Sequence, residues 1–159
     1  MTGVQTCALP ICLRELASQH SDQLGVNIGY DEGLAHLVEA GADIFLMPSR
    51  FEPCGLNQIY SLRYGTVPLV RQTGGLADTV IDFTPHADRN GLANGFMFHE
   101  PTPQALYETI ERALELYPKP ILWRKLACRG MELDFSWETS AQQYLRIYQK
   151  ARKVVLTEG

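Results

Sequence analysis

The sequence has 159 residues, of which 45% are hydrophobic and 20% are charged, and its formal net charge is −4. This length suits a single domain, and the composition is that of a globular protein rather than a disordered chain. The acidic balance argues against nucleic-acid binding, and no apolar run reaches the ~18 residues of a membrane helix. The four cysteines form no CxxC pair, which argues against a zinc knuckle, a thioredoxin motif and a disulfide scaffold. We therefore expect a reduced, cytoplasmic setting.

The first twelve residues are expected to lie outside the fold. Residues 1–11 read MTGVQTCALPI, which lacks the basic start and apolar centre of a secretory signal and shows neither strand alternation nor helical spacing. The string resembles a leader that recurs in metagenomic reading frames and is translated from sequencing adapter. We therefore expect an artefactual leader over residues 1–12 and a truncated domain over residues 13–159. The alternative is a native N-terminal extension.

From residue 13 onward, predicted strands alternate with predicted helices. Apolar spacing, capping residues and glycine or proline stops predict helices over residues 13–20, 31–40, 56–64, 103–116, 121–131 and 137–155. Short apolar runs predict strands over residues 25–29, 43–47, 67–70 and 95–98. The run 43–47 is typical of a strand buried on both faces, and residues 73–75 and 83–94 are expected to be loops. The alternation predicts an α/β fold with a partial Rossmann-like, doubly wound parallel sheet.

The residues with chemical interest follow two of these strands. Ligands of doubly wound sheets collect at the carboxyl ends of the strands, and residues 48–56 and 71–78 both follow such ends, so these loops should face one crevice. Gly55 lets the backbone come close to a ligand, and the helix behind it offers unpaired N–H groups that suit a phosphate. Glu52 lies just before this helix and can hydrogen-bond a hydroxyl of the group that carries the phosphate.

Further residues complete a predicted nucleotide-sugar site. Gly74 and Gly75 can present backbone N–H groups where any side chain would block approach, and Tyr30 can stack on a base. The structural alternatives are a core role for Tyr30 and a plain surface charge for Glu52. Arg71 can either contact the ligand or pair with a neighbouring carboxylate. The four histidines are scattered without ligand spacing, so no metal site is expected.

The stretch GADIFLMPSRFEPCGLNQIYSLRYGTVPLVRQTGGLADTVID, residues 41–82, resembles the donor-binding segment of bacterial-type glycogen and starch synthases. The similarity runs from about residue 13 to residue 148 and includes VNIGY and the terminal DFSW. These enzymes are retaining glucosyltransferases of the two-domain GT-B class, which transfer glucose from ADP-glucose to the non-reducing end of an α-1,4-glucan. The resemblance implies a fragment of the C-terminal half of such an enzyme, with this donor and acceptor as partners and with no cofactor and no metal.

The resemblance also implies roles for individual residues. Glu52 corresponds to the catalytic glutamate that contacts the donor glucose, and Tyr30 corresponds to the aromatic residue that packs on adenine. The residues at the helix entrance correspond to those that hold the sugar and the diphosphate, namely Cys54, Gly55 and Leu56. The loop near the glucose and the distal phosphate corresponds to Thr73, Gly74 and Gly75. Tyr60 stands where related glycosyltransferases carry a second glutamate, so no pair of carboxylates is expected.

The resemblance further implies that parts of the enzyme are missing. The N-terminal domain, and the arginine and lysine that clamp the diphosphate, would lie before residue 13. We therefore expect the fragment alone to be poorly folded and inactive. In it, the strand 25–29 would have no neighbour, and the strand 43–47 would lie at an exposed edge of the sheet.

The last predicted helix, residues 137–155, would dock toward the missing domain. Trp137 is expected to anchor the start of this helix, and Tyr144 and Tyr148 are expected to pack in the core or against the missing domain. Two other functions remain open. One is a non-catalytic nucleotide-binding module that works with a partner chain. The other is a related retaining glycosyltransferase that uses UDP-glucose or makes sucrose.

Overall fold

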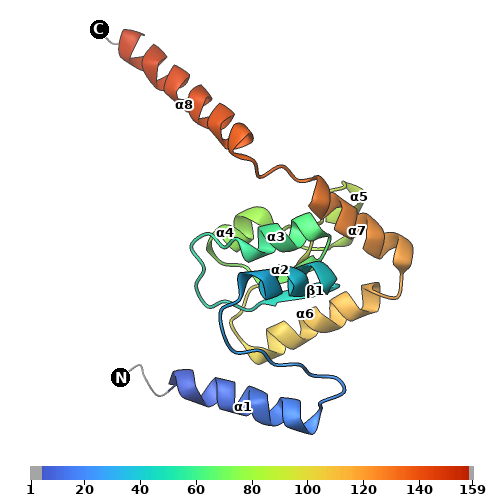
Figure 1. Ribbon diagram of the computed structural model, residues 1–159. Coiled ribbons are helices and arrows are strands. Elements are labelled where there is room, and N and C mark those ends of the chain that lie inside the picture. The colour runs from blue at the N-terminus through green and yellow to red at the C-terminus, as the bar shows by residue number, and fades with distance from the viewer. Residues whose placement is uncertain (1–4, 158–159) are drawn as a thin grey trace. The chain divides into compact units, whose positions relative to one another are not determined.

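The computed structural model describes the backbone of residues 5–157 and the side chains of residues 10–152. The chain divides into two compact units, Met1–Ala35 and His36–Gly159. Figure 1 shows the elements in chain order from α1 to α8. Each unit is described by itself below.

The first unit contains helix α1 (Gln5–Gln19), which runs through Pro10. Residues 5–11 lie in this helix although their sequence shows no helical spacing, and the interpretation of residues 1–12 as an artefactual leader stays a prediction. The predicted strand 25–29 is wrong, because these residues form no strand in the structure. A strand needs a hydrogen-bonding neighbour as well as an apolar sequence, and the sheet that the structure describes pairs only residues of the second unit.

Helix α2 (Glu32–Gly41) begins where the sequence predicts. The N–H of Leu34 donates a hydrogen bond to Oδ1 of Asp31 at 3.0 Å, so Asp31 caps the helix as expected. This cap satisfies one of the backbone donors that every helix leaves free in its first turn.

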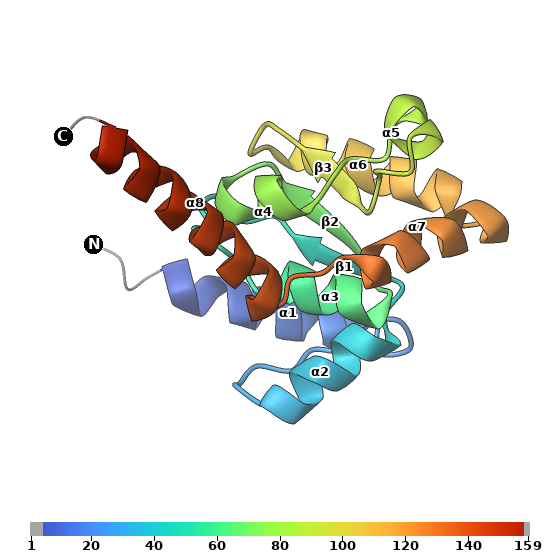
Figure 2. The same cartoon turned by 90° about the horizontal axis from the view of Figure 1, so that it is seen from above.

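The second unit is built on a parallel sheet whose strands are β1 (Ile44–Met47), β2 (Val67–Arg71) and β3 (Phe96–Phe98). The strands lie side by side in the order β1-β2-β3, as the view from above shows (Figure 2). This arrangement confirms three of the predicted strands and their parallel pairing. It also confirms that β1 lies at an edge. The side chain of Leu46 is 46% exposed at this edge, so the expectation that β1 is buried on both faces is wrong.

Six helices follow along the chain of the second unit: α3 (Asn57–Tyr64), α4 (Gly74–Thr79), α5 (Pro85–Arg89), α6 (Pro103–Leu116), α7 (Pro120–Glu132) and α8 (Trp137–Thr157). Gly65 ends α3 in the left-handed conformation, as expected. The expected loops at 73–75 and 83–94 are corrected, because α4 begins at Gly74 and α5 lies inside the second segment. Both helices are too short to show an apolar period in the sequence.

The sheet has an apolar core on each of its faces, which confirms the doubly wound arrangement. Leu69 points into a cluster formed with α5, α6 and α7, whereas its neighbour Val70 points into a second cluster with Leu76 and Val80. This split follows from the alternation of side chains along a strand. Figure 1 shows α6 on one side of the sheet and α3 and α4 on the other.

Two ion pairs fasten the segments around β3. Arg112 of α6 contacts Asp82 at 2.8 Å, and Oδ1 of Asp82 also accepts a 2.8 Å hydrogen bond from the N–H of Met97. Arg129 of α7 contacts Asp88 of α5 at 2.8 Å. These contacts hold the connections at the amino end of β3 in place.

Helix α8 begins with the predicted cap, since Oγ of Ser136 accepts a hydrogen bond from the N–H of Thr139 at 3.3 Å. Trp137 is 85% exposed, so the expectation that it anchors the helix is wrong in this structure. Tyr144 and Tyr148 are also exposed, with ring centroids 6.3 Å apart, and neither lies in the core. Among the described residues, no helix combines the length and apolar character needed to cross a membrane.

Candidate functional site

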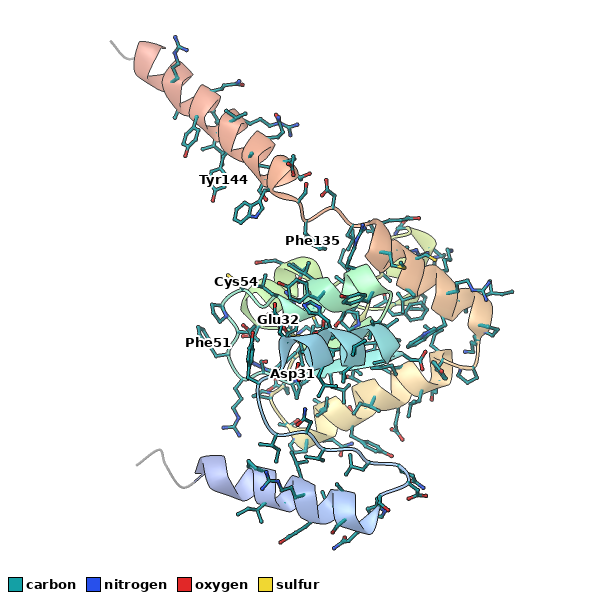
Figure 3. The ribbon with its side chains drawn as sticks, in the orientation of Figure 1. Asp31, Glu32, Phe51, Cys54, Phe135 and Tyr144 are labelled. Carbon is teal, nitrogen blue, oxygen red and sulfur yellow. The ribbon has the colours of Figure 1, made fainter. Side chains whose placement is uncertain are left out.

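The two loops that the sequence singles out lie against each other. Because β1 and β2 pair in parallel, their carboxyl ends lie together, and the segments that follow Met47 and Arg71 start as neighbours. The N–H of Gly75 donates a hydrogen bond to the carbonyl oxygen of Pro53 at 3.2 Å, which joins the loops directly. Figure 3 shows Phe51 and Cys54 on the outer side of the first loop, with their side chains turned to solvent.

Glycine is needed at positions 74 and 75 because the loops approach so closely. A Cβ atom on Gly74 would overlap the carbonyl oxygen of Glu52, and one on Gly75 would overlap that of Cys54. Gly74 also has a φ of 46°, in the left-handed region. The sequence-based explanation that the N–H of Gly75 faces a ligand is thus wrong, since that group bonds Pro53. A ligand contact by either glycine stays a prediction.

The start of α3 is open to an anion. Leu56 is the N-cap residue, and no side chain in the described structure caps the helix. Gly55 precedes it with a φ of 69°, so the chain turns sharply before entering the helix. A helix with free N–H groups at its start carries a partial positive charge there, which attracts phosphate.

The remaining predicted residues gather around this turn. Glu52 is half-buried three residues before Gly55, and Thr73 is half-buried at the start of α4. Cys54 is exposed and Leu56 is 58% exposed, so both face solvent beside the open helix start. The structure therefore brings seven of the eight predicted site residues together.

Tyr30 is the eighth predicted residue, and it belongs to the first unit. Its side chain is 92% exposed, so the alternative that it is a core residue is wrong. An exposed ring suits stacking on a base, and that role stays a prediction.

Arg71 forms no ion pair with a carboxylate among the described residues, so that alternative is wrong, whereas its contact with a ligand stays a prediction. One guanidinium nitrogen, Nη1, donates to the carbonyl oxygen of Arg50 at 2.8 Å, and the structure records no carboxylate partner among the described residues. Its Nε atom is buried without a hydrogen-bond partner. Arg71 therefore fastens the first loop to the end of β2.

Gln58 was not singled out in the sequence analysis, although its side chain makes three hydrogen bonds in this region. It lies in the first turn of α3 with an exposure of 0%, and its amide nitrogen donates to the carbonyl oxygens of Cys54 at 3.1 Å and Gly55 at 2.9 Å. It also donates to Oγ1 of Thr79 in α4 at 3.2 Å. A glutamine on an amphipathic helix is usually a surface residue. The one sequence signal for a different role of Gln58 is its position three residues after Gly55.

Tyr60 is turned away from this turn. Its ring packs against His36 with a centroid distance of 5.4 Å. It also lines a separate pocket of about 370 Å³ with Arg63 and Phe135. Tyr60 therefore has a packing role at the position where related enzymes carry a second glutamate.

The family of the chain follows from comparison with known proteins. A family profile described as "Glycosyl transferases group 1" matches residues 18–127, which is more than half of the sequence. The chain belongs to the group 1 glycosyl transferases. The match includes both loops of the site and all three strands of the sheet.

Among curated proteins, this glycosyl transferase chain is similar to bacterial glycogen synthases. It is 58% identical over 138 residues to glycogen synthase 2 of Nitrosococcus oceani, an alignment that covers 87% of this chain and 28% of that protein. It is also 58% identical over 148 residues to the glycogen synthase of Thioalkalivibrio sulfidiphilus, covering 93% of this chain and 31% of that protein. The chain thus spans less than a third of the length of these relatives.

Solved structures confirm the predicted fold class. The catalytic domain of starch synthase IV from Arabidopsis thaliana, bound to ADP and acarbose, superposes with a TM-score of 0.78 at 37% identity, covering 88% of this chain and 29% of that chain. A sucrose-phosphate synthase from Thermosynechococcus elongatus gives a TM-score of 0.61 at 24% identity, covering 89% of this chain and 34% of that chain, which is a likeness of fold alone. The resemblance to the glycogen and starch synthases noted in the sequence is confirmed.

Proposed function

We propose that this chain is the donor-binding part of a glycogen synthase that transfers glucose from ADP-glucose to the non-reducing end of an α-1,4-glucan with retention. The observation that carries the proposal is the 58% identity to a glycogen synthase over 138 residues. The starch synthase IV structure is bound to ADP, which supports an adenine nucleotide as the leaving group here. The fold supports the proposal with two loops that meet at the carboxyl ends of adjacent strands.

In this proposal each residue of the site has its own role in the transfer. The carboxylate of Glu52 hydrogen-bonds the glucose, while the open start of α3 at Gly55 and Leu56 stabilises the negative charge that grows on the departing diphosphate. Cys54 and Thr73 line the sugar side of the turn, and Tyr30 stacks on adenine. The diphosphate charge is met by helix N-termini and basic side chains.

The same proposal accounts for the parts of the chain outside the site. Residues 13–159 form a truncated C-terminal domain and residues 1–12 a leader. An N-terminal domain supplies the acceptor side of the cleft, and the start of the C-terminal domain, before residue 13, supplies the basic diphosphate clamp. The exposed aromatic residues Trp137, Tyr144 and Tyr148 support docking of α8 against that domain. The free thiols of the described cysteines suit a reducing compartment such as the cytoplasm.

A chimeric enzyme tests the proposal. Residues 13–159 replace the matching region of Nitrosococcus oceani glycogen synthase 2, and the incorporation of labelled glucose into glycogen is measured with ADP-glucose and with UDP-glucose. We expect chain elongation with ADP-glucose as the preferred donor. A folded chimera that prefers UDP-glucose would favour the related glycosyltransferase, and one that binds ADP without transferring glucose would favour the nucleotide-binding module.

A further inference from the structure

Gln58 holds the turn between Glu52 and α3 in one conformation. Its amide nitrogen faces three oxygen atoms at hydrogen-bonding distance, and two of them are consecutive backbone carbonyls, those of Cys54 and Gly55. Because the side chain is completely buried, water does not compete for these contacts. The turn is therefore fixed from the inside of the molecule.

The direction of these two carbonyls determines where the neighbouring N–H groups point. The described part of the chain contains no cis peptide bond, and in a trans peptide the C=O and the following N–H point in opposite directions. Since the carbonyls of Cys54 and Gly55 point toward the buried amide of Gln58, the N–H groups of Gly55 and Leu56 point away from it. They face the open side of the turn, next to the uncapped start of α3.

Packing alone does not explain a glutamine at this position. The Oε1 atom of Gln58 is buried and has no hydrogen-bond partner, which costs about 1–3 kcal/mol. A methionine has nearly the same length and would avoid this cost. The glutamine is therefore explained by what its amide nitrogen does.

We infer that Gln58 is a positioning residue that turns the N–H groups of Gly55 and Leu56 outward to receive the diphosphate of the nucleotide-sugar. The inference rests on the proposed function and adds to it a residue that does not touch the donor. Thr79 extends the arrangement, because its hydroxyl accepts from Gln58 and donates to the carbonyl oxygen of Gly75 at 2.8 Å. Gln58 thus links the turn to α4 as well.

The test follows the backbone amides of Gly55 and Leu56 by NMR while ADP is added to the chimera described above, which carries the diphosphate clamp and is labelled with 15N at glycine and leucine. ADP is expected to shift both amide signals in the unsubstituted protein. Gln58→Met removes the donor at constant length and should weaken ADP binding by roughly tenfold to a hundredfold, the effect of misaligning charge-assisted hydrogen bonds. The matched control is Thr109→Val, which removes another buried polar group whose recorded hydrogen bond lies within α6. It should leave ADP affinity unchanged.

A second variant separates positioning from a general loss of stability. Gln58→Glu keeps the shape, cannot donate when ionised, and can donate again when protonated. Relative to the unsubstituted protein at each pH, its ADP affinity should recover as the pH is lowered, while thermal unfolding at each pH reports stability separately.

Two results would overturn the inference. One is an ADP affinity of Gln58→Met equal to that of the unsubstituted protein. The other is that ADP shifts neither the Gly55 nor the Leu56 amide signal of the unsubstituted protein. The proposed function is judged separately by glucose transfer in the chimera described above. A chimera that transfers glucose and is indifferent to Gln58→Met would reject the role of Gln58 and leave the proposed function standing.

Discussion

Two parts of the second unit use their buried polar groups in different ways. In the anchored part, residues 82–132, the buried and half-buried charges meet partners, as in the pairs Asp82–Arg112 and Asp88–Arg129. The site part, residues 39–79, differs in this respect. It contains all the buried side-chain atoms that have no hydrogen-bond partner in the described structure, namely Glu39 Oε2, Gln58 Oε1, Ser61 Oγ and Arg71 Nε.

The comparison separates stability from function. A fully paired network adds to stability, whereas an unpaired buried polar atom costs free energy and persists where something else requires it. Changes in the anchored part should therefore affect unfolding and leave ligand binding intact. Changes in the site part should affect ligand binding, and they should change the free energy of unfolding only where they remove an unpaired buried atom or disturb the contact between the loops.

The largest expected effect comes from Glu52. In the chimera, Glu52→Ala should lower turnover by roughly 10²–10³-fold, as expected when a group that stabilises the transition state is lost. Glu100→Ala is the control, since Glu100 is an exposed carboxylate that follows β3 at the same edge of the sheet. Initial rates at saturating ADP-glucose give the comparison. Equal rates for Glu52→Ala and the unchanged chimera would remove Glu52 from the site.

The contact between the loops should be the most sensitive point for folding. Gly74→Ala combines a left-handed backbone with an overlap on the carbonyl of Glu52, and it should cost about 2–4 kcal/mol of the free energy of unfolding. Gly91→Ala has the same type of backbone, φ 71°, with open space around the new Cβ, so it should cost only about 1 kcal/mol. Urea unfolding measures both. Equal costs would show that the loops can move apart freely.

A change in the anchored part should lower the free energy of unfolding by a smaller amount and should leave ADP binding intact. Asp82→Ala leaves the N–H of Met97 and the guanidinium of Arg112 without their acceptor, which should cost about 2 kcal/mol after allowing for the partial exposure of the pair. ADP affinity, measured on the same preparation, should stay unchanged. Weaker ADP binding in this variant would mean that the two parts are coupled.

The smallest effect should come from Glu39 and should depend on pH. Burial raises the pKa of Glu39, and His36 partly opposes this by lowering it. The folded state therefore binds the proton of Glu39 more tightly than the unfolded state does. The contribution of this proton binding to the free energy of unfolding is complete below the unfolded pKa of ~4.3 and is lost as the pH rises through the folded pKa. Glu39→Gln should accordingly gain about 0.5–1 kcal/mol at pH 7 and nothing at pH 4. A gain of equal size at both pH values would contradict this assignment.

The sequence predicts the regular elements well where local signals and long-range pairing agree. The helix 103–116 is found at its predicted bounds, because Thr102 caps it and Pro103 opens it. The prediction of residues 25–29 as a strand failed because composition says nothing about the presence of a neighbouring strand. Helix α5 has the same Thr-Pro start, at Thr84, but it is too short for its period to be visible.

The site was predicted in part. The residues with distinctive chemistry or turn geometry, such as Glu52 and Gly55, could be found from the sequence because they follow strand ends. The close contact that requires glycine at position 75 was missed because the sequence cannot show that a second backbone occupies the space a side chain would fill. Gln58 was missed for the same reason, since its importance lies in contacts with groups that only the fold brings near.

The turn after α5 is a suitable place to insert a tag, because in a parallel sheet it lies at the end opposite the candidate site. Residues 90–92 are exposed and lie on the approach to the amino end of β3, whereas the two loops of the candidate site follow the carboxyl ends of β1 and β2. A fluorescent protein or an affinity tag inserted there would lie near the amino ends of the strands. Such a graft would let the protein be tracked or immobilised without obstructing the candidate site.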